Sequence, residues 1–555
     1  MKTGRILLAA AVFAPAVLAP IVASAQDKEE VLVDEADGRP RIPLATGARF
    51  LASPLRAPKL EVAKPAFTFT STSEVLSYDN RDYQELDEAT DQRVIDTDDR
   101  RTFGHTDVIA SVSYRPEPRL KFDAQIKYDL RWRDDSLGRA GKSGVVNLYR
   151  LNATYDLVQS EAFNLKLKIG RQPFKIGGVP TDYMLSGTLD ALVFEANFGK
   201  FGGLRVLAVD FFGGHDQPVS GYQFYRDGSE TVFGLRGETN TLRHGAIYDF
   251  DYKIAEGQRL DLKAYYFYAS IGGGPIDESG ADISYGGTLG NFRDNDYQHM
   301  RGLRAKYAMD FADDAGTLMV FGEFANSDGL DRKAVVERDV KTGGNAFGGG
   351  AQVSVRATKC TSFYLGADAY HFDGAQYASD GLEFERGFVS FRGARLGGLT
   401  VGRLSGWRPS ANMDAFGIDH TPQDISRSGG TFFVHAAGGA RMGPMSLRLD
   451  WWMYQDTAST FMDLDNIDGI PDPPFGRSRA EFEAQARVGK SLGQEINVEL
   501  ARKLGENMRI YLSYGSFTPG EYYEIVVPRV AGERNTALGG DAGFWAARFG
   551  AMVNF

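Results

Sequence analysis

Charged side chains at alternate positions along several segments are the residues of this sequence that could do chemistry. Guanidinium and ammonium groups that line a hydrated path attract anions, and rings of charge decide which solutes pass. The same groups form ion pairs where carboxylates face them. The candidate cations of such a path are Arg131, Arg150, Lys166, Lys168, Arg171, Arg304, Lys306, Arg356, Arg448 and Arg548. Their chemistry is electrostatic selection of solutes, not the making or breaking of bonds.

Carboxylates share the face that carries these cations, so two interpretations remain open. The acids are Asp107, Asp123, Asp129, Asp156, Asp249, Asp251, Asp310, Glu323, Asp368, Asp450 and Glu499. Such an interior must be hydrated or paired, because an unpaired buried ion costs several kcal/mol. Interstrand ion-pair ladders are the favoured interpretation for most single residues, and a selectivity path is the functional one. Because the cations and carboxylates of this face are nearly equal in number, the sequence by itself predicts no preference for anions.

Nucleophilic catalysis is a less favoured alternative. The sequence has seven histidines, none of which stands in a recognisable nucleophile motif, and Gly-x-Ser-x-Gly is absent. A barrel hydrolase would have to assemble its site from residues far apart in the chain. We therefore predict that the protein is not an enzyme.

Neither a cofactor nor a nucleic-acid partner is predicted. Cys360 is the only cysteine and can form no internal disulfide and no cysteine-based metal site. Residues 463–469 resemble a calcium loop, but Ile467 occupies a ligand position and the later bidentate acid is missing. An Asx-rich surface turn is favoured there over a loop Ca²⁺. The net charge of −11 argues against nucleic acid, which binds basic surfaces.

The elements that must position the charges are β-strands, because apolar and polar residues alternate with a period of two. Between Leu120 and Trp132 every second residue is apolar, and the others are charged or amides. Similar alternation recurs in residues 149–156, 163–169, 246–253, 260–268, 347–356 and 445–453. A tilted membrane strand requires roughly nine to eleven residues. The chain is therefore predicted to be all-β, a transmembrane antiparallel β-barrel with a charged lumen.

The N-terminal region has the pattern of a removable export signal. Lys2 and Arg5 precede an apolar run over residues 6–22 and the small residues Ala23-Ser24-Ala25, which is the order of a secretory signal peptide. We predict a signal peptide over residues 1–25, a flexible periplasmic segment over 26–65 and the barrel over 66–555. Because an exported chain that forms a β-barrel belongs in the outer membrane, we predict that the protein is in the outer membrane of a Gram-negative bacterium.

Short turns alternate with long polar stretches, as periplasmic turns alternate with extracellular loops in bacterial barrels. Short turns are predicted at residues 115–119, 255–258, 312–316, 357–361 and 504–507. Long loops are predicted at 79–104, 133–145, 173–190, 213–242, 271–298 and 518–542. This rhythm gives about eighteen strands, within a range of 16–20. The number of strands is eighteen if residues 385–408 form a folded loop, and twenty if they form a hairpin hinged at Gly397-Gly398.

The last strand is predicted to close the barrel. Phe549, Val553 and Phe555 share one face, with Arg548 and Asn554 on the other. An edge strand must find a partner, so this strand should pair with the first one. A terminal aromatic residue of this kind resembles the signal that the outer-membrane barrel assembly machinery recognises. The predicted partners are that machinery, outer-membrane lipid and lipopolysaccharide, and a translocated solute or polysaccharide.

Two short stretches carry a family resemblance. Residues 168–178, which contain Gly170-Arg171-Gln172, are followed by a strand around Asp190, and residues 492–497 and 514–520 form a C-terminal hairpin pattern. These stretches resemble alginate-export-type outer-membrane β-barrels. The resemblance implies an eighteen-stranded pore whose arginine-rich constriction passes an anionic polysaccharide outward. It also implies that Arg150 and Arg171 line the path.

The sequence thus predicts an outer-membrane channel for an anionic polysaccharide or another charged solute. The alternative is a general passive porin for small solutes, because the same wall pattern would serve both. A barrel hydrolase is the least favoured of the three functions.

Overall fold

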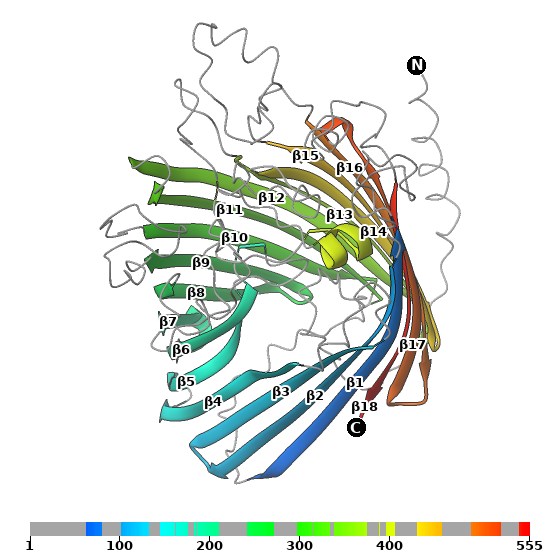
Figure 1. Ribbon diagram of the computed structural model, residues 1–555. Coiled ribbons are helices and arrows are strands. Elements are labelled where there is room, and N and C mark those ends of the chain that lie inside the picture. Colours follow the sequence, from blue (N-terminus) through cyan, green and yellow to red (C-terminus); the bar gives the residue numbers. More distant parts are fainter. Residues whose placement is uncertain are drawn as a thin grey trace, which may run out of the picture.

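Eighteen antiparallel strands form one sheet that closes into a barrel (Figure 1). The computed structural model describes residues 63–79, 101–132, 145–160, 162–175, 183–184, 186–209, 241–270, 297–312, 315–333, 338–374, 388, 396–405, 430–457, 490–522 and 543–555. Each strand pairs with its neighbour in the chain, and β1 pairs with both β2 and β18. The all-β fold and the number of strands are as predicted.

The strands follow one another with few other elements between them. They are β1 (Ala63–Asp79), β2 (Arg101–Glu117), β3 (Leu120–Trp132), β4 (Val145–Gln159), β5 (Asn164–Lys175), β6 (Ser186–Asn197), β7 (Gly203–Val209), β8 (Thr241–Ala255), β9 (Gln258–Ser270), β10 (Tyr297–Phe311), β11 (Gly316–Lys333), β12 (Arg338–Thr358), β13 (Thr361–Phe372), β14 (Thr431–Met442), β15 (Met445–Asp456), β16 (Ser491–Leu504), β17 (Met508–Pro519) and β18 (Phe544–Asn554). A short 3₁₀ helix, η2 (Gly199–Phe201), joins β6 to β7. The first strand begins three residues before the predicted barrel start at residue 66.

The seam between β1 and β18 joins the two ends of the barrel sequence. The pairing runs from Thr70 opposite Asn554 to Asp79 opposite Trp545. Beyond it, the backbone N–H groups of Phe69 and Phe555 each donate to the carbonyl of the other, at 3.1 and 2.8 Å. The sheet therefore has no free edge, which is the condition for backbone groups in lipid to be satisfied. The register places Phe549 opposite Val75 and Val553 opposite Ser71.

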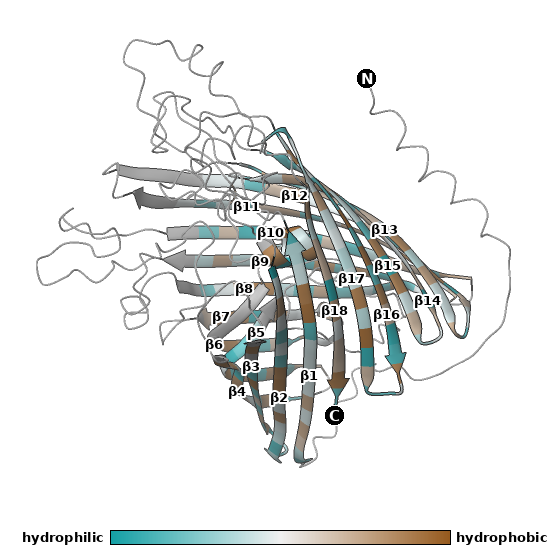
Figure 2. Ribbon diagram, turned by 45° about the vertical axis from the view of Figure 1, so that its right-hand side comes forward, coloured by the Kyte–Doolittle hydropathy of each residue, from teal (hydrophilic) through white to brown (hydrophobic). Residues whose placement is uncertain are grey.

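The outer face of the wall is apolar and the inner face is polar, and Figure 2 shows this alternation along the strands. Large apolar side chains point outward with much of their surface exposed, as in Leu365 at 62% and Ile169 at 55%. A soluble protein would not expose an apolar band all around its circumference. The barrel therefore spans a membrane, and its architecture is that of an outer-membrane protein. Among the described residues, no helix has the length and apolarity needed to cross a membrane.

One end of the barrel carries short turns, as predicted. Two residues separate β2 from β3, β8 from β9, β12 from β13 and β14 from β15. The choice between eighteen and twenty strands is decided by residues 396–405, which contain the π-helical segment η4 (Leu399–Ser405) and no strand. Gly397, with φ of +80°, precedes η4. The hairpin alternative at Gly397-Gly398 was therefore wrong, and the folded loop was correct.

Candidate functional site

The lumen is the candidate site, because strand alternation turns the charged face of each strand inward. On β2 and β3, Lys127 Nζ lies 3.2 Å from Asp107 Oδ1, and Lys121 Nζ lies 2.9 Å from Asp123 Oδ1. These side chains are between 14% and 38% exposed. Partial exposure keeps their charges hydrated, so this part of the wall is a wet surface and not a dry core.

A second group of ion pairs lies on β7 to β10. Asp249 accepts from Arg205 at 2.7 Å and pairs with Lys263 at 3.1 Å. Lys306 Nζ lies 2.8 Å from Asp261 Oδ2. Each pair joins neighbouring strands, so the charges form the ladder that the sequence pattern favours.

Arg304 and Glu323 form a more buried pair between β10 and β11. Their side chains are only 5% and 1% exposed, with Nη1 and Oε2 at 3.8 Å. Tyr265 donates its hydroxyl to Glu323 at 3.0 Å, and the Arg304 guanidinium lies over the Phe321 ring. The hydrogen bond and the ring offset part of the cost of burying the pair.

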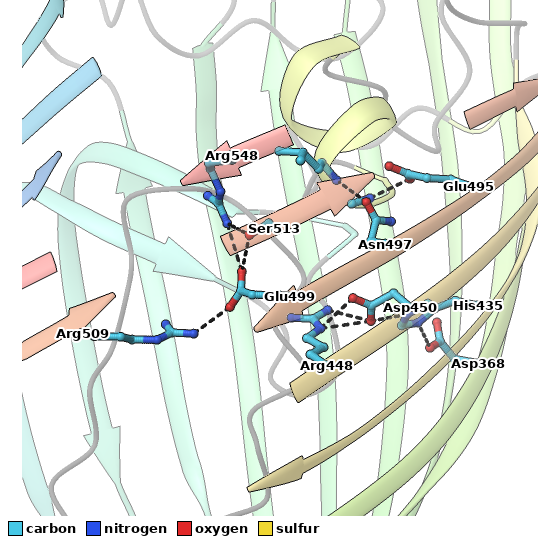
Figure 3. Close-up of polar contacts among 12 residues, drawn as sticks. Asp368, His435, Arg448, Asp450, Glu495, Asn497, Glu499, Arg509, Ser513 and Arg548 are labelled. Carbon is cyan, nitrogen blue, oxygen red and sulfur yellow. Dashed lines mark hydrogen bonds and ion pairs between the residues drawn. The ribbon is translucent and has the colours of Figure 1, made fainter. Parts of the chain in front are cut away.

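His435 lies between two carboxylates on the inner face of β14 (Figure 3). Its Nδ1 is 2.7 Å from Asp368 Oδ1, and its Nε2 is 3.4 Å from Asp450 Oδ1. The ring stacks on Trp452, with centroids 3.8 Å apart. Arg448 also pairs with Asp450, at 2.7 Å. An imidazole can donate to an acceptor on both sides only when both nitrogens are protonated, so the geometry favours the cation.

Glu499 on β16 pairs with two arginines, one on β17 and one on β18 (Figure 3). Arg509 and Arg548 each place Nη2 near one of its oxygens, at 2.7 and 3.0 Å. Ser513 donates its hydroxyl to the same carboxylate at 3.1 Å. Arg548 is 4% exposed and lies over the ring of Tyr511. This cluster continues the ion-paired wall up to the last strand.

The segment η4 folds into the lumen and lies against the wall. It contacts β16, β17 and β18, where the inward side chains Glu495 and Asn497 accept hydrogen bonds from its backbone. Arg403, near its C-terminal end, donates to Glu74 on β1. The lumen therefore contains a structured inward segment in addition to its wall.

Tyr183, which lies between β5 and β6 in the chain, is inside the barrel. Tyr183 is fully buried, and its ring packs edge-on against Tyr370 and Phe433, with centroids 5.1 Å from each. These partners belong to β13 and β14, which lie far around the barrel from β5 and β6. The contact therefore places Tyr183 against the wall opposite β5 and β6.

Most of the cations predicted from the sequence lie on the inward face. The inward set is Arg150, Lys166, Lys168, Arg304, Lys306, Arg356, Arg448 and Arg548, as their strand registers place them. They do not converge on one point but spread around the wall. Arg131 stands at the end of β3, and its side chain lies outside the described residues.

Arg171 is the exception, and its predicted place in the path is wrong. It pairs with Leu151, which is 52% exposed on the outer face, and it shares a face with Ile169. Its Nη1 donates to the carbonyl of Leu148 at 3.2 Å. Alternation along β5 thus places Arg171 on the outer side of the wall, and the motif resemblance misplaced it.

Sequence reasoning missed several residues of the lumen, among them Arg509, Arg403, Glu495 and Asn497. Arg509 could have been found, because it alternates with Ile510 and Leu512 on β17. Arg403 had no such signal, since it lies outside any alternating segment. Glu495 and Asn497 alternate correctly on β16, but nothing local indicated that they would hold a loop.

Several predictions fall outside the described residues. They are the signal peptide at 1–25, all but the last three residues of the segment at 26–65, and the calcium-like loop at 463–469. Within the described ranges, no group of three or more His, Cys, Asp or Glu side chains is placed to hold a metal ion.

An apolar outer wall around a charged lumen defines the class of this protein as a transmembrane β-barrel of the outer-membrane type. No family model matches its sequence, and no curated protein matches it significantly. The fold is similar to that of the outer membrane protein OprD from Pseudomonas aeruginosa, with 10% identity, coverage of 90% of this chain and 96% of that chain, and a TM-score of 0.44.

Two further solved structures are similar in fold. Pseudomonas aeruginosa OccD3 (OpdP) is 12% identical, with coverage of 89% of this chain and 92% of that chain and a TM-score of 0.43. Acinetobacter baumannii OccAB2 is 9% identical, with coverage of 89% and 98% and a TM-score of 0.46.

Proposed function

We propose that this protein is an outer-membrane channel that passes small hydrophilic solutes passively. The observation that carries the proposal is the inner wall, where cations and carboxylates alternate around the barrel and keep part of their surface exposed. Asp249, Lys263 and Lys306 are examples, with side chains 34%, 14% and 19% exposed. Such a wall is compatible with water and small ions along its length, whereas a structural barrel could fill its interior with apolar side chains.

Export of an anionic polysaccharide is a weaker candidate on the same observations. The resemblance that suggested it implies that Arg150 and Arg171 line the path, and Arg171 lies on the outer face. The inward cations Lys127, Arg205 and Arg448 each have a carboxylate within 3.2 Å. Paired cations attract a polyanion less than free ones, so a small-solute channel fits this lumen better.

A barrel hydrolase built on the buried histidine is disfavoured by the contacts of His435. Both of its ring nitrogens face carboxylate oxygens. A general base for a serine or a water needs one nitrogen directed at that group. His435 is therefore engaged in the wall itself.

Single-channel recording in planar bilayers tests the proposed function. We expect discrete current steps in salt solution, a reversal potential of modest size in a salt gradient, and swelling of proteoliposomes in small sugars or amino acids. Protein that is folded by its heat-modifiable mobility on gels but carries no current would overturn the proposal. A strong anion preference with block by polyuronates would restore the polysaccharide candidate.

A further inference from the structure

The inward segment η4 begins with backbone N–H groups that need partners. The first N–H groups of a helical segment have no acceptor within it. Here the barrel wall supplies the acceptors, from two side chains of β16 that are close together and face the lumen. We call Glu495 and Asn497 the η4 seat.

Glu495 makes most of the contacts of the η4 seat. It is fully buried, and its carboxylate accepts from the backbone N–H groups of Gly398, Thr400 and Val401 at 2.8, 2.9 and 3.2 Å. Tyr454 donates its hydroxyl to the same group at 2.9 Å, and the Thr400 hydroxyl donates as well. Hydrogen bonds to an ionised acceptor are about twice as strong as neutral ones.

Asn497 completes the row by accepting from the backbone N–H of Leu399 at 2.8 Å (Figure 3). The N–H groups of four successive residues, 398–401, are therefore all held by two side chains of one strand. A loop without specific contacts to the wall would not find a side-chain acceptor on the wall for each of these N–H groups.

Glycines allow this close approach on both sides of the contact. A Cβ on Gly398 would lie 2.1 Å from the Asn497 amide nitrogen. On the wall, a Cβ on Gly515 of β17 would lie 2.6 Å from the Asn497 amide oxygen and 3.0 Å from Leu399. Larger residues at either glycine would push η4 away from the wall.

The other end of η4 is tied to a different strand. Arg403 donates from Nη1 to Glu74 Oε2 at 3.1 Å, and Nη2 also contacts the Glu74 carboxylate. Because Glu74 is on β1, η4 is fixed to β16 at its start and to β1 at its end, and it covers β17 and β18 between them. The Arg403 side chain stays 15% exposed.

We infer that Glu495 and Asn497 are positioning residues that hold η4 as a fixed constriction of the channel, and that Arg403, held in place by this seat, is a selectivity-determining residue. The inference rests on the proposed channel function. According to this inference, η4 sets the width of the path. Arg403, which lies outside the barrel strands, sets part of the charge preference of the channel.

Hydrogen–deuterium exchange in detergent micelles tests the seat without reference to transport. In Glu495→Ala, we expect the amides of residues 398–401 to exchange roughly 10-fold to 100-fold faster, as the loss of hydrogen bonds to a charged group implies. Glu499→Ala is the matched control, a lumen carboxylate on the same strand that accepts from Arg509, Ser513 and Arg548, and it should leave those amides protected. Unchanged exchange in Glu495→Ala would overturn the seat.

Channel recordings test the role of η4 and Arg403. Glu495→Ala should give larger or noisier current steps than the wild type, and Glu495→Gln, which keeps one acceptor oxygen, should be intermediate. Arg403→Ala should shift the reversal potential toward cation preference in the wild-type background and shift it less in the Glu495→Ala background, where η4 is released at its start and Arg403 is held only through Glu74.

The outcomes separate the inference from the proposed function. Released amides combined with unchanged current and reversal potential would overturn the constriction role of η4. Equal effects of Arg403→Ala in both backgrounds would overturn its dependence on the seat. Absence of any current through folded wild-type protein would instead overturn the channel function itself.

Discussion

Arg548 on the last strand and Glu74 on the first strand face each other across the seam of the barrel, with Nη1 and Oε2 3.6 Å apart. Tyr511 donates its hydroxyl to the same carboxylate at 2.8 Å, and Arg403 contacts it from η4. His105 on β2 lies 3.5 Å from its other oxygen. One buried carboxylate thus connects four elements at the place where the chain closes on itself.

Replacing Glu74 should destabilise the closed barrel. Removing one member of a buried ion network leaves its partners uncompensated and costs about 3–5 kcal/mol, and Glu74 is only 3% exposed. We expect Glu74→Gln to lower the temperature at which the protein loses its folded gel mobility. Asp261→Asn is the control, since that carboxylate is 36% exposed and its pair with Lys306 contributes about 1 kcal/mol or less. Equal effects of the two variants would contradict the role of the seam.

Alternation predicted the wall because each strand faces two different media. From Phe122 to Trp132 the register with β2 follows the sequence pattern residue by residue, since a shift of one position would place charges in lipid. The same rule places Arg171 beside Ile169 on the outer face. The prediction that Arg171 lines the path followed the motif resemblance and not the alternation.

The lumen filling could not be predicted in the same way. Gly398 and Glu495 are 97 positions apart in the chain, and neither lies in a pattern that indicates the other. Tyr183 likewise meets Tyr370 only because the barrel brings β13 opposite the β5–β6 connection. A period of two describes which way a strand residue points, but it says nothing about what a loop contacts across the lumen.

The charge of His435 should make ion selectivity depend on pH. The groups that face it are Asp368 on β13 and, on β15, Asp450 with its partner Arg448. As pH rises, the imidazole loses its proton and the lumen becomes more negative by one charge. We expect the reversal potential to move toward cation preference between about pH 5 and pH 8, the range in which histidine side chains change charge.

His435→Lys provides the comparison for that pH dependence. A lysine stays protonated over most of this range, so the variant should show a smaller change in reversal potential than the wild type. A wild-type reversal potential that does not change with pH would rule out His435 as a titrating charge of the path.

Arg171 should have little effect on conduction because it is on the outer face. We expect Arg171→Ala to leave the reversal potential unchanged, whereas Arg448→Ala, which removes a half-buried inward cation, should shift it toward cation preference. Bilayer recordings in a salt gradient measure both. A shift in Arg171→Ala as large as that in Arg448→Ala would contradict the outward position and revive the polysaccharide path.

Tyr183 should hold the β5–β6 connection against the opposite wall. Its ring is fully buried among aromatic side chains, and truncation of a buried aromatic residue to alanine costs about 3–5 kcal/mol. Because this energy belongs to the contact across the lumen and not to the strand ladder, Tyr183→Ala should leave the barrel folded but release the connection. We expect larger or noisier current steps with unchanged gel mobility.

Tyr248→Ala is the control for this prediction, because Tyr248 is at an outward position and is 40% exposed. This variant should conduct like the wild type. If the wild type, Tyr183→Ala and Tyr248→Ala all carried the same current, the connection would not narrow the path.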